Sequence, residues 1–179
     1  LALKSDGTVV QWGYDFQAGG VPEGLSDVVD VAADDASSLA LKADGTVVAW
    51  GGYGETSTVP AGTAGILEIA SGLYHNLAVK DDGTLIAWGN NAYGQCTKAS
   101  EATGLKAISA GPYGEVAGVT TANTVAQLAS RNFPNPVAAT LAGVASVSAG
   151  GNGSAALMGD GTVAAWGSPG TPITALPQG

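Results

Sequence analysis

LALKADGTVVAWG, residues 39–51, is the stretch that decides the fold. Two short β-prone runs flank Asp44-Gly45, and this pattern predicts a β-hairpin because glycine accepts the positive φ of a tight turn. The pattern recurs along the chain at steps of 38, 38, 40 and 38 residues. The copies begin at Leu1, Leu39, Leu77, Ala117 and Ala155. The copy at Ala117 is degenerate, with Asn123 in place of the turn glycine and Leu128 in place of the tryptophan.

A second β-prone run precedes the hairpin in four of the five units. These runs begin at Val28, Ile66, Leu105 and Val144, and the first unit lacks one. We also expect a short outer strand after the Trp-Gly pair, Thr56–Val59 in the second unit, ended by Pro60. Four short strands in about 38 residues are typical of a propeller blade. The sequence therefore predicts an all-β β-propeller of four-stranded blades, with five hairpin units, four of them complete.

The repeat boundaries divide one predicted propeller domain, residues 1–179, into five units. These units span about 1–27, 28–65, 66–104, 105–143 and 144–179. The chain opens inside a strand-like run, so we expect a segment of a longer product and a larger ring. An open blade edge is something natural proteins avoid. We therefore expect further blades of the same parent chain, or neighbouring subunits, to cover the open edges.

IASGLYHNLAVKDDGTLIAWGNNAYGQ, from Ile69 to Gln95, resembles the repeat of the regulator of chromosome condensation family. The matching positions are Ile69-Ala70-Ser71-Gly72, His75 and Leu77-Ala78-Val79. Asn76 departs from the motif, where a small residue is usual. The short repeat is most similar to bacterial members of the family. The resemblance implies a ring that usually has seven blades and that serves as a scaffold. It also implies two activities to consider, inhibition of a secreted enzyme such as a β-lactamase and guanine nucleotide exchange on a small GTPase.

Charge excludes several classes of partner. The chain has 6 Lys and Arg against 15 Asp and Glu, a net charge of −9. Nucleic acids and anionic membrane surfaces need clustered cations, so we expect neither as a partner. No apolar run approaches the ~18 residues of a membrane span, so we expect no membrane insertion. Cys96 is the one cysteine of the chain, which excludes an internal disulfide.

The sequence offers little material for catalysis or metal binding. His75 is the one histidine, and no G-x-S-x-G motif occurs, so a catalytic triad is not expected. One histidine and one cysteine cannot complete a zinc site. Cys96 lies in a polar segment where we expect no helix to activate a thiolate. The turn aspartates are followed by glycine in hairpin positions, which indicates turn chemistry rather than calcium loops. We predict no enzymatic activity, no cofactor and no metal.

Two sets of loops are candidate binding surfaces. One set follows the inner strands and offers Asp34, Asp35, Leu73, Tyr74, His75 and Tyr113. The other set follows the Trp-Gly pairs and offers Tyr14, Phe16, Tyr53, Tyr93, Arg131 and Phe133. Exposed tyrosines among Gly, Asn and Ser are typical of protein- or glycan-binding surfaces. The same rings could instead cap the packing between blades, and the family resemblance implies a structural position for His75. Asp34-Asp35 could hold a weakly bound cation or a basic partner.

These observations favour a non-enzymatic binding module that engages a protein or a glycan through its loops. We expect it in a bacterial or phage protein that is secreted or surface-exposed, since the acidic, lysine-poor composition suits an exposed surface. Besides the activities implied by the resemblance, a structural role as a repeat that builds an assembly remains an alternative.

Overall fold

The computed structural model describes residues 1–13, 20–34, 37–52, 54–92, 94–129, 140–151 and 153–167. Within these residues the chain forms five antiparallel sheets. The first has two strands, β1 (Ala2–Leu3) and β2 (Val9–Val10). The second has β3 (Val28–Ala33), β4 (Ser38–Lys42) and β5 (Val47–Trp50), and the third has β6 (Ile66–Gly72), β7 (His75–Lys80) and β8 (Leu85–Gly89). The fourth has β9 (Leu105–Ala110), β10 (Val116–Thr120) and β11 (Val125–Ala129), and the fifth has β12 (Val144–Ala149), β13 (Gly153–Met158) and β14 (Val163–Gly167).

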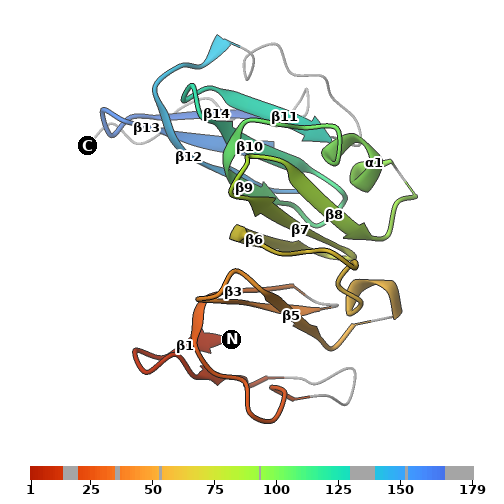
Figure 1. Cartoon of the computed structure of the whole chain (residues 1–179). Coiled ribbons are helices and arrows are strands. Elements are labelled where there is room, and N and C mark those ends of the chain that lie inside the picture. Colours follow the sequence, from red (N-terminus) through yellow and green to blue (C-terminus); the bar gives the residue numbers. More distant parts are fainter. Residues whose placement is uncertain are drawn as a thin grey trace.

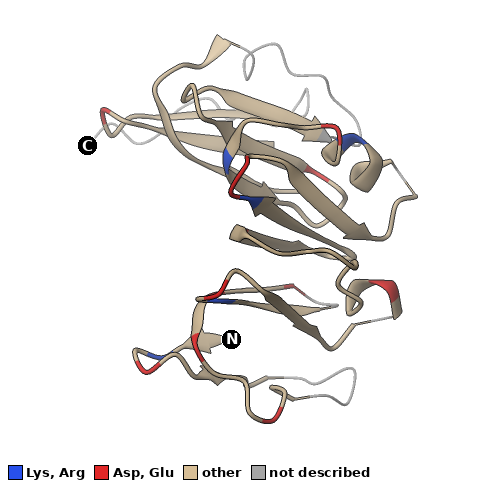
Figure 2. Ribbon diagram, viewed as in Figure 1, with Lys and Arg blue, Asp and Glu red and all other residues tan. Residues whose placement is uncertain are grey.

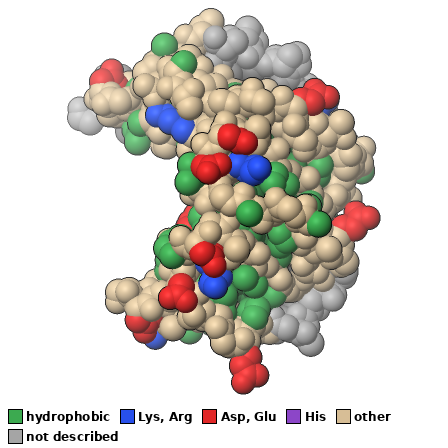
Figure 3. Space-filling view, in the orientation of Figure 1, with side chains coloured by type: hydrophobic (Ala, Val, Ile, Leu, Met, Phe, Trp, Pro, Cys, Tyr) green, Lys and Arg blue, Asp and Glu red, His purple; other side chains and the backbone are tan. Residues whose placement is uncertain are grey.

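The sheets follow one another along an arc, in chain order from β1 to β14 (Figure 1). The strands β3, β6, β9 and β12 contact one another in sequence and form the inner column of the arc. The space-filling view shows a C-shaped outline with a hollow between its two ends (Figure 3). This confirms the predicted all-β class and the propeller-type stacking of one hairpin unit upon the next.

Every complete sheet has three strands among the described residues, so the fourth strand predicted for the second and third blades does not form there, and in the fourth and fifth units the corresponding segment lies outside the described residues. The expected outer strand Thr56–Val59 is replaced by a short 3-10 helix, η1 (Gly54–Thr56). Two hydroxyls, Ser57 Oγ and Thr58 Oγ1, donate hydrogen bonds to the Gly54 carbonyl at 3.1 and 3.2 Å. These local bonds hold the chain in a turn, so the segment cannot extend alongside β5.

The expectation of no helix is also wrong in the third unit, where α1 (Gln95–Ala99) follows β8. Its start is fixed by two features. Gly94 has a φ of 72°, a value that favours glycine. The Asn91 side-chain oxygen accepts hydrogen bonds from the backbone N–H groups of Cys96 and Thr97 at 3.0 and 3.3 Å. This is the capping chemistry that satisfies the free N–H groups of a first helical turn.

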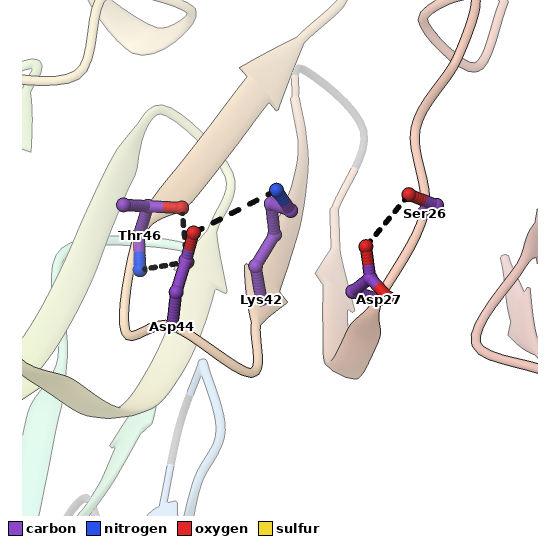
Figure 4. Close-up of polar contacts among 5 residues, drawn as sticks. All are labelled: Ser26, Asp27, Lys42, Asp44 and Thr46. Atoms are coloured by element: carbon purple, nitrogen blue, oxygen red, sulfur yellow. Dashed lines mark hydrogen bonds and ion pairs between the residues drawn. The ribbon is translucent and has the colours of Figure 1, made fainter.

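The predicted hairpins form, and the aspartates act as turn residues. Asp44 Oδ1 accepts bonds from the Thr46 backbone N–H at 3.0 Å and from Thr46 Oγ1 at 2.6 Å (Figure 4). These bonds hold the pKa of the Asp44 carboxyl below its ordinary value. Gly45 has a φ of 78° and lies against the next unit, because a Cβ there would come within 3.2 Å of Gly65 Cα. Its carbonyl accepts a hydrogen bond from the Ile66 N–H at 3.1 Å, which links one blade to the next.

Three of the four tryptophans pack between neighbouring sheets, whereas Trp12 in the first unit is 70% exposed. Trp50, Trp88 and Trp166 are all buried. The indole N–H of Trp50 donates to Gln11 Oε1 of the preceding unit at 2.8 Å, and that of Trp166 donates to Gln127 Oε1 at 3.2 Å. Between the second and third units, Ala49 stands where the other two joints have glutamine, and the Trp88 indole N–H donates instead to the Thr56 carbonyl at 3.1 Å. Each of these three joints therefore satisfies a buried indole with an acceptor from the unit before it.

Candidate binding face

The loops that follow β3, β6, β9 and β12 lie at the same end of the inner strands, and we call them the loop face. Neighbouring loops touch through their first glycines. A Cβ at Gly72 would lie 2.7 Å from the Gly111 carbonyl oxygen, and a Cβ at Gly111 would lie 3.3 Å from that of Gly150. Backbone therefore meets backbone from one blade to the next, which fixes the spacing of the loops.

Tyr74 and Tyr113 project from two neighbouring loops of this face. Their exposed fractions are 47% and 49%, which is large for aromatic side chains. The Tyr74 carbonyl accepts a hydrogen bond from the Asn90 N–H at 2.7 Å, and the Tyr113 N–H donates to Glu115 Oε2 at 3.0 Å. The Tyr113 ring lies against the next loop, where a Cβ at Gly151 would come within 3.0 Å of it. The backbone of both tyrosines is thus anchored while much of each residue remains exposed.

Two buried polar residues support these loops from beneath. His75 begins the middle strand β7 and pairs with Gly72 at the end of β6, and Glu115 directly precedes Val116, which pairs with Ala110 at the end of β9. His75 is only 1% exposed, and desolvation lowers its pKa to about 4. Its Nε2 is buried without a hydrogen-bond partner. The histidine therefore lies under the loop in its neutral form, and Tyr74 is the part of this loop that a partner would meet.

The other predicted site residues fall into two groups. Asp34 and Leu73 belong to the loop face and are half-buried, and the Asp34 N–H donates to the Ser37 carbonyl at 3.1 Å. The remaining candidates lie outside the described residues: Tyr14, Phe16, Asp35, Tyr53, Tyr93, Arg131 and Phe133. The structure thus brings Asp34, Leu73, Tyr74 and Tyr113 to one face, and the loops after the Trp-Gly pairs stay a prediction.

A buried polar cluster behind the loop face centres on Asn76, which is fully buried. Its Oδ1 accepts hydrogen bonds from Ser37 Oγ at 3.1 Å and from Ser71 Oγ at 2.8 Å. Its Nδ2 donates at 2.8 Å to the Thr56 carbonyl, which also accepts from the Trp88 indole. Asn76, which departs from the family motif, therefore ties the second blade, η1 and the third blade together.

Cys96 has the properties of a buried structural thiol. Its Sγ donates to the Asn90 carbonyl at 3.3 Å. Burial, with a smaller contribution from the charge of Glu55, raises its pKa to about 11. A thiol with such a pKa is a poor nucleophile at neutral pH. Among the described residues no group of three or more His, Cys, Asp or Glu is placed to hold a metal ion. No helix in the described part of the chain is long and apolar enough to cross a membrane.

Sequence reasoning missed three supports of this face, namely Glu115, Gly151 and the Asn76 cluster. Aligning the units offers a signal for the first, since Glu115 stands where the third unit has His75. A polar residue retained at a position next to a buried strand indicates a hydrogen-bonding role. Gly151 belongs to the unit after Tyr113, and Ser37 and Thr56 lie 39 and 20 residues from Asn76, so no local pattern could identify them.

The described blades define a protein built of stacked propeller-type repeats. Residues 66–95 match the family model of the regulator of chromosome condensation (RCC1) repeat. The chain therefore carries the repeat of this family, as the sequence motif predicted. No curated protein matches the chain as a whole.

Solved structures show the same architecture. The ectodomain of the receptor kinase CR4 from Physcomitrella patens superposes with a TM-score of 0.67 at 25% identity, over 87% of this chain and 45% of that one. Yeast RCC1 (Prp20) in its complex with Kap60 gives a TM-score of 0.59 at 19% identity, covering 78% and 43%. A separate structure of Prp20p from Saccharomyces cerevisiae, described together with its binding properties to Gsp1p and histones, has a TM-score of 0.59 at 21% identity. The match covers 78% of this chain and 45% of that one. The chain spans about half the length of the structures that it matches.

Proposed function

We propose that this chain is a non-enzymatic protein-binding module that engages its partner through Tyr74 and Tyr113 on the loop face. The observation that carries the proposal is that both tyrosines are half-exposed although the backbone around them is fixed by neighbouring loops. Rigid aromatic side chains supply contact area at a low cost in conformational entropy, which is why they dominate protein interfaces.

The comparisons support this class of function. Yeast RCC1 is described in complex with Kap60 and with binding to Gsp1p and histones, so a relative of this fold binds proteins. The moss relative is the ectodomain of a receptor kinase, which makes an extracellular setting for this fold reasonable. We extend to this chain only the use of a propeller face for binding proteins, and we include a secreted or surface-exposed location in the proposal.

The test selects ligands for the wild-type chain and then asks whether the loop face binds them. A library of random 12-residue peptides displayed on phage is panned against the chain, and enriched peptides are synthesised and titrated by calorimetry. We expect the Tyr74→Ala/Tyr113→Ala variant to lose at least about tenfold in affinity, because aromatic anchors dominate binding energy.

Leu157→Ala is the matched control, since Leu157 is an exposed apolar residue on the fifth sheet, away from Tyr74. It should leave the affinities within about twofold, as expected of a residue outside the interface. Equal affinities of the wild type and the double tyrosine variant would refute the proposal. A glycan array probed with the same proteins separates protein binding from glycan binding. If Tyr74 is needed for binding to glycans on the array but not for binding to the peptides, the loop face is a glycan-binding face.

A further inference from the structure

The inner strands carry a second exposed feature, at the end opposite the loop face. The pairing of β3 with β4 passes from Val28 opposite Lys42 to Asp30 opposite Leu41, so Val29 is an extra residue in a β-bulge. In β6 the pairing passes from Ile66 opposite Lys80 to Glu68 opposite Val79, which makes Leu67 the extra residue. A bulge redirects the inserted side chain out of the sheet alternation. Val29 and Leu67 are accordingly 54% and 63% exposed.

The fold does not require aliphatic side chains at these bulges. In β9 and β12 the same irregularity places Lys106 and Ala145 at the equivalent position, and both are exposed. A polar or a small residue therefore fills the bulge equally well. Valine and leucine at the other two bulges leave more than half of their surface exposed, and exposed apolar groups next to each other are typical of interaction sites. Because β3 and β6 are in contact, Val29 and Leu67 belong to one surface.

Carboxylates border this aliphatic pair. Asp30 and Glu68 follow Val29 and Leu67 directly and are half-buried. Glu68 Oε1 accepts one hydrogen bond from the Ile108 N–H at 3.2 Å, and Asp30 Oδ1 accepts one from the Val31 N–H at 2.8 Å. Burial raises the pKa of the Glu68 carboxyl, and the nearby charge of Asp30 raises it further. The two acids are therefore close enough to repel each other, a repulsion that a cation from a partner would relieve.

Charges of both signs surround the pair, and four carboxylates, those of Asp30, Asp44, Glu68 and Asp81, outnumber the three lysine amines. The Asp81 carboxylate lies beside Gly65, at 3.4 Å from the position of a Cβ on that glycine, one residue before β6. Of the nearby amines, Lys42 is within 3.7 Å of Asp44, and Lys106 donates to Asn123. Lys80 lies opposite Ile66 at the edge of the surface. Figure 2 shows acidic residues at the tips of the hairpins along this side of the arc, with basic residues beside them.

We propose that Val29 and Leu67, with the carboxylates of Asp30 and Glu68, form a docking surface for an extended segment of a partner protein that carries lysine or arginine beside apolar side chains. The exposed aliphatic pair supplies the apolar contact, and the acidic border selects cationic segments through charge complementarity. This bulge surface lies at the opposite end of the inner strands from Tyr74 and Tyr113, so it is independent of the loop face.

The experiment titrates the full chain with three acetylated, amidated peptides, made of four Lys-Leu, four Lys-Ser or four Glu-Leu repeats, and measures binding by fluorescence anisotropy. We expect the Lys-Leu peptide to bind at least about tenfold more tightly than either of the others, because it alone offers both cations and apolar groups. Equal binding of the Lys-Leu and Lys-Ser peptides would mean that charge alone acts, and this would overturn the proposal.

Variants then locate the binding. Val29→Ala/Leu67→Ala removes the apolar area without changing charge, and Ala145 shows that alanine fits this bulge. We expect it to weaken the Lys-Leu peptide by about tenfold, whereas Leu157→Ala, the matched apolar control, should change binding less than about twofold. Asp30→Asn/Glu68→Gln should also weaken the Lys-Leu peptide, and Glu101→Gln, on an exposed residue after α1, should not. Unchanged affinity in the Val29/Leu67 variant would overturn the proposal even if the Tyr74 and Tyr113 results hold.

Discussion

Replacing Asn76 by aspartate tests how the second and third blades are held together. The substitution preserves the shape of the side chain and both of the hydrogen bonds that Ser37 and Ser71 donate to Oδ1. It removes one donor, because Nδ2 becomes a carboxylate oxygen that faces the Thr56 carbonyl at 2.8 Å. Asn76 is fully buried, so solvent does not screen the new charge, and among the described residues the two serine hydroxyls are the side-chain donors left to it.

The expected loss of stability follows from these contacts. A buried carboxylate facing a carbonyl oxygen loses a hydrogen bond and gains a desolvation penalty, together about 3 kcal/mol at pH 7. For a domain of this size, that lowers the melting temperature by roughly 6–12 °C. The pH dependence has a definite sign. Burial raises the folded-state pKa of the new carboxyl above its unfolded value near 3.9. The variant is therefore least destabilised below about pH 4, and the deficit grows as the pH rises through the folded-state pKa.

The assay is thermal unfolding of both proteins between pH 4 and pH 8, followed by tryptophan fluorescence, because Trp88 donates to the same Thr56 carbonyl. The difference between the two proteins at each pH isolates the new group. The control is Ser154→Ala, which changes the residue equivalent to Asn76 in the fifth blade without adding a charge. A variant as stable as the wild type at pH 8, or a deficit that shrinks as pH rises, would refute the reasoning.

Three further predictions follow from single residues. Gly83→Asn should destabilise the chain by about 1 kcal/mol more than Gly161→Asn. Both glycines have a φ near 80°, but a Cβ at Gly83 would come within 3.0 Å of Gly104 Cα, whereas a Cβ at Gly161 would meet no atom within 4 Å. Equal free energies of unfolding of the two variants in urea would contradict this prediction. Burial lowers the pKa of His75 from 6.5 in the unfolded chain to about 4 in the folded chain, so between these pH values only the unfolded chain binds the proton. The free energy of unfolding of the wild type should therefore fall by about 3 kcal/mol as the pH falls from 6.5 to 4. In denaturant titrations, the His75→Gln variant should show a weaker dependence on pH. Cys96, with a pKa of about 11 and a buried side chain, should react with a thiol reagent at pH 8 only when denaturant unfolds the chain, and rapid reaction of the folded protein would disprove this.

The parts of the fold that the sequence predicted are those set by local patterns. The hairpins, their Asp-Gly turns and the inner strands are fixed by neighbours within a few residues, as Asp44 and Thr46 illustrate. The outer strand was predicted wrongly at Thr56 because this residue's carbonyl is held by Asn76 and Trp88, which lie 20 and 32 residues away. Helix α1 was missed because five residues are too few for helical periodicity to show.

The candidate site divides in the same way. Tyr74 and Tyr113 could be predicted because glycine-rich loops at equivalent positions mark exposed segments. Of the groups that hold them, Glu115 is signalled only by its alignment with His75, and Gly151 has no local signal because it belongs to the next unit. A single sequence places residues on a loop, and only the packing of one unit on another shows which of them are covered.

The variation between units follows from their packing. Most positions that join blades keep one chemistry, as with the buried tryptophans Trp50, Trp88 and Trp166, although Asn123 replaces the turn glycine and Leu128 replaces the tryptophan in the fourth unit. Positions that do not join blades vary in residue type from unit to unit. The bulge residue is valine, leucine, lysine or alanine in successive units, all in the same irregularity of the inner strand. Because the fold accommodates all four side chains at this position, the stability of the fold does not determine which one is present, and the residue can instead be suited to binding a partner. An exposed aliphatic pair on adjacent strands, beside two acids, is therefore better explained by a partner than by the fold.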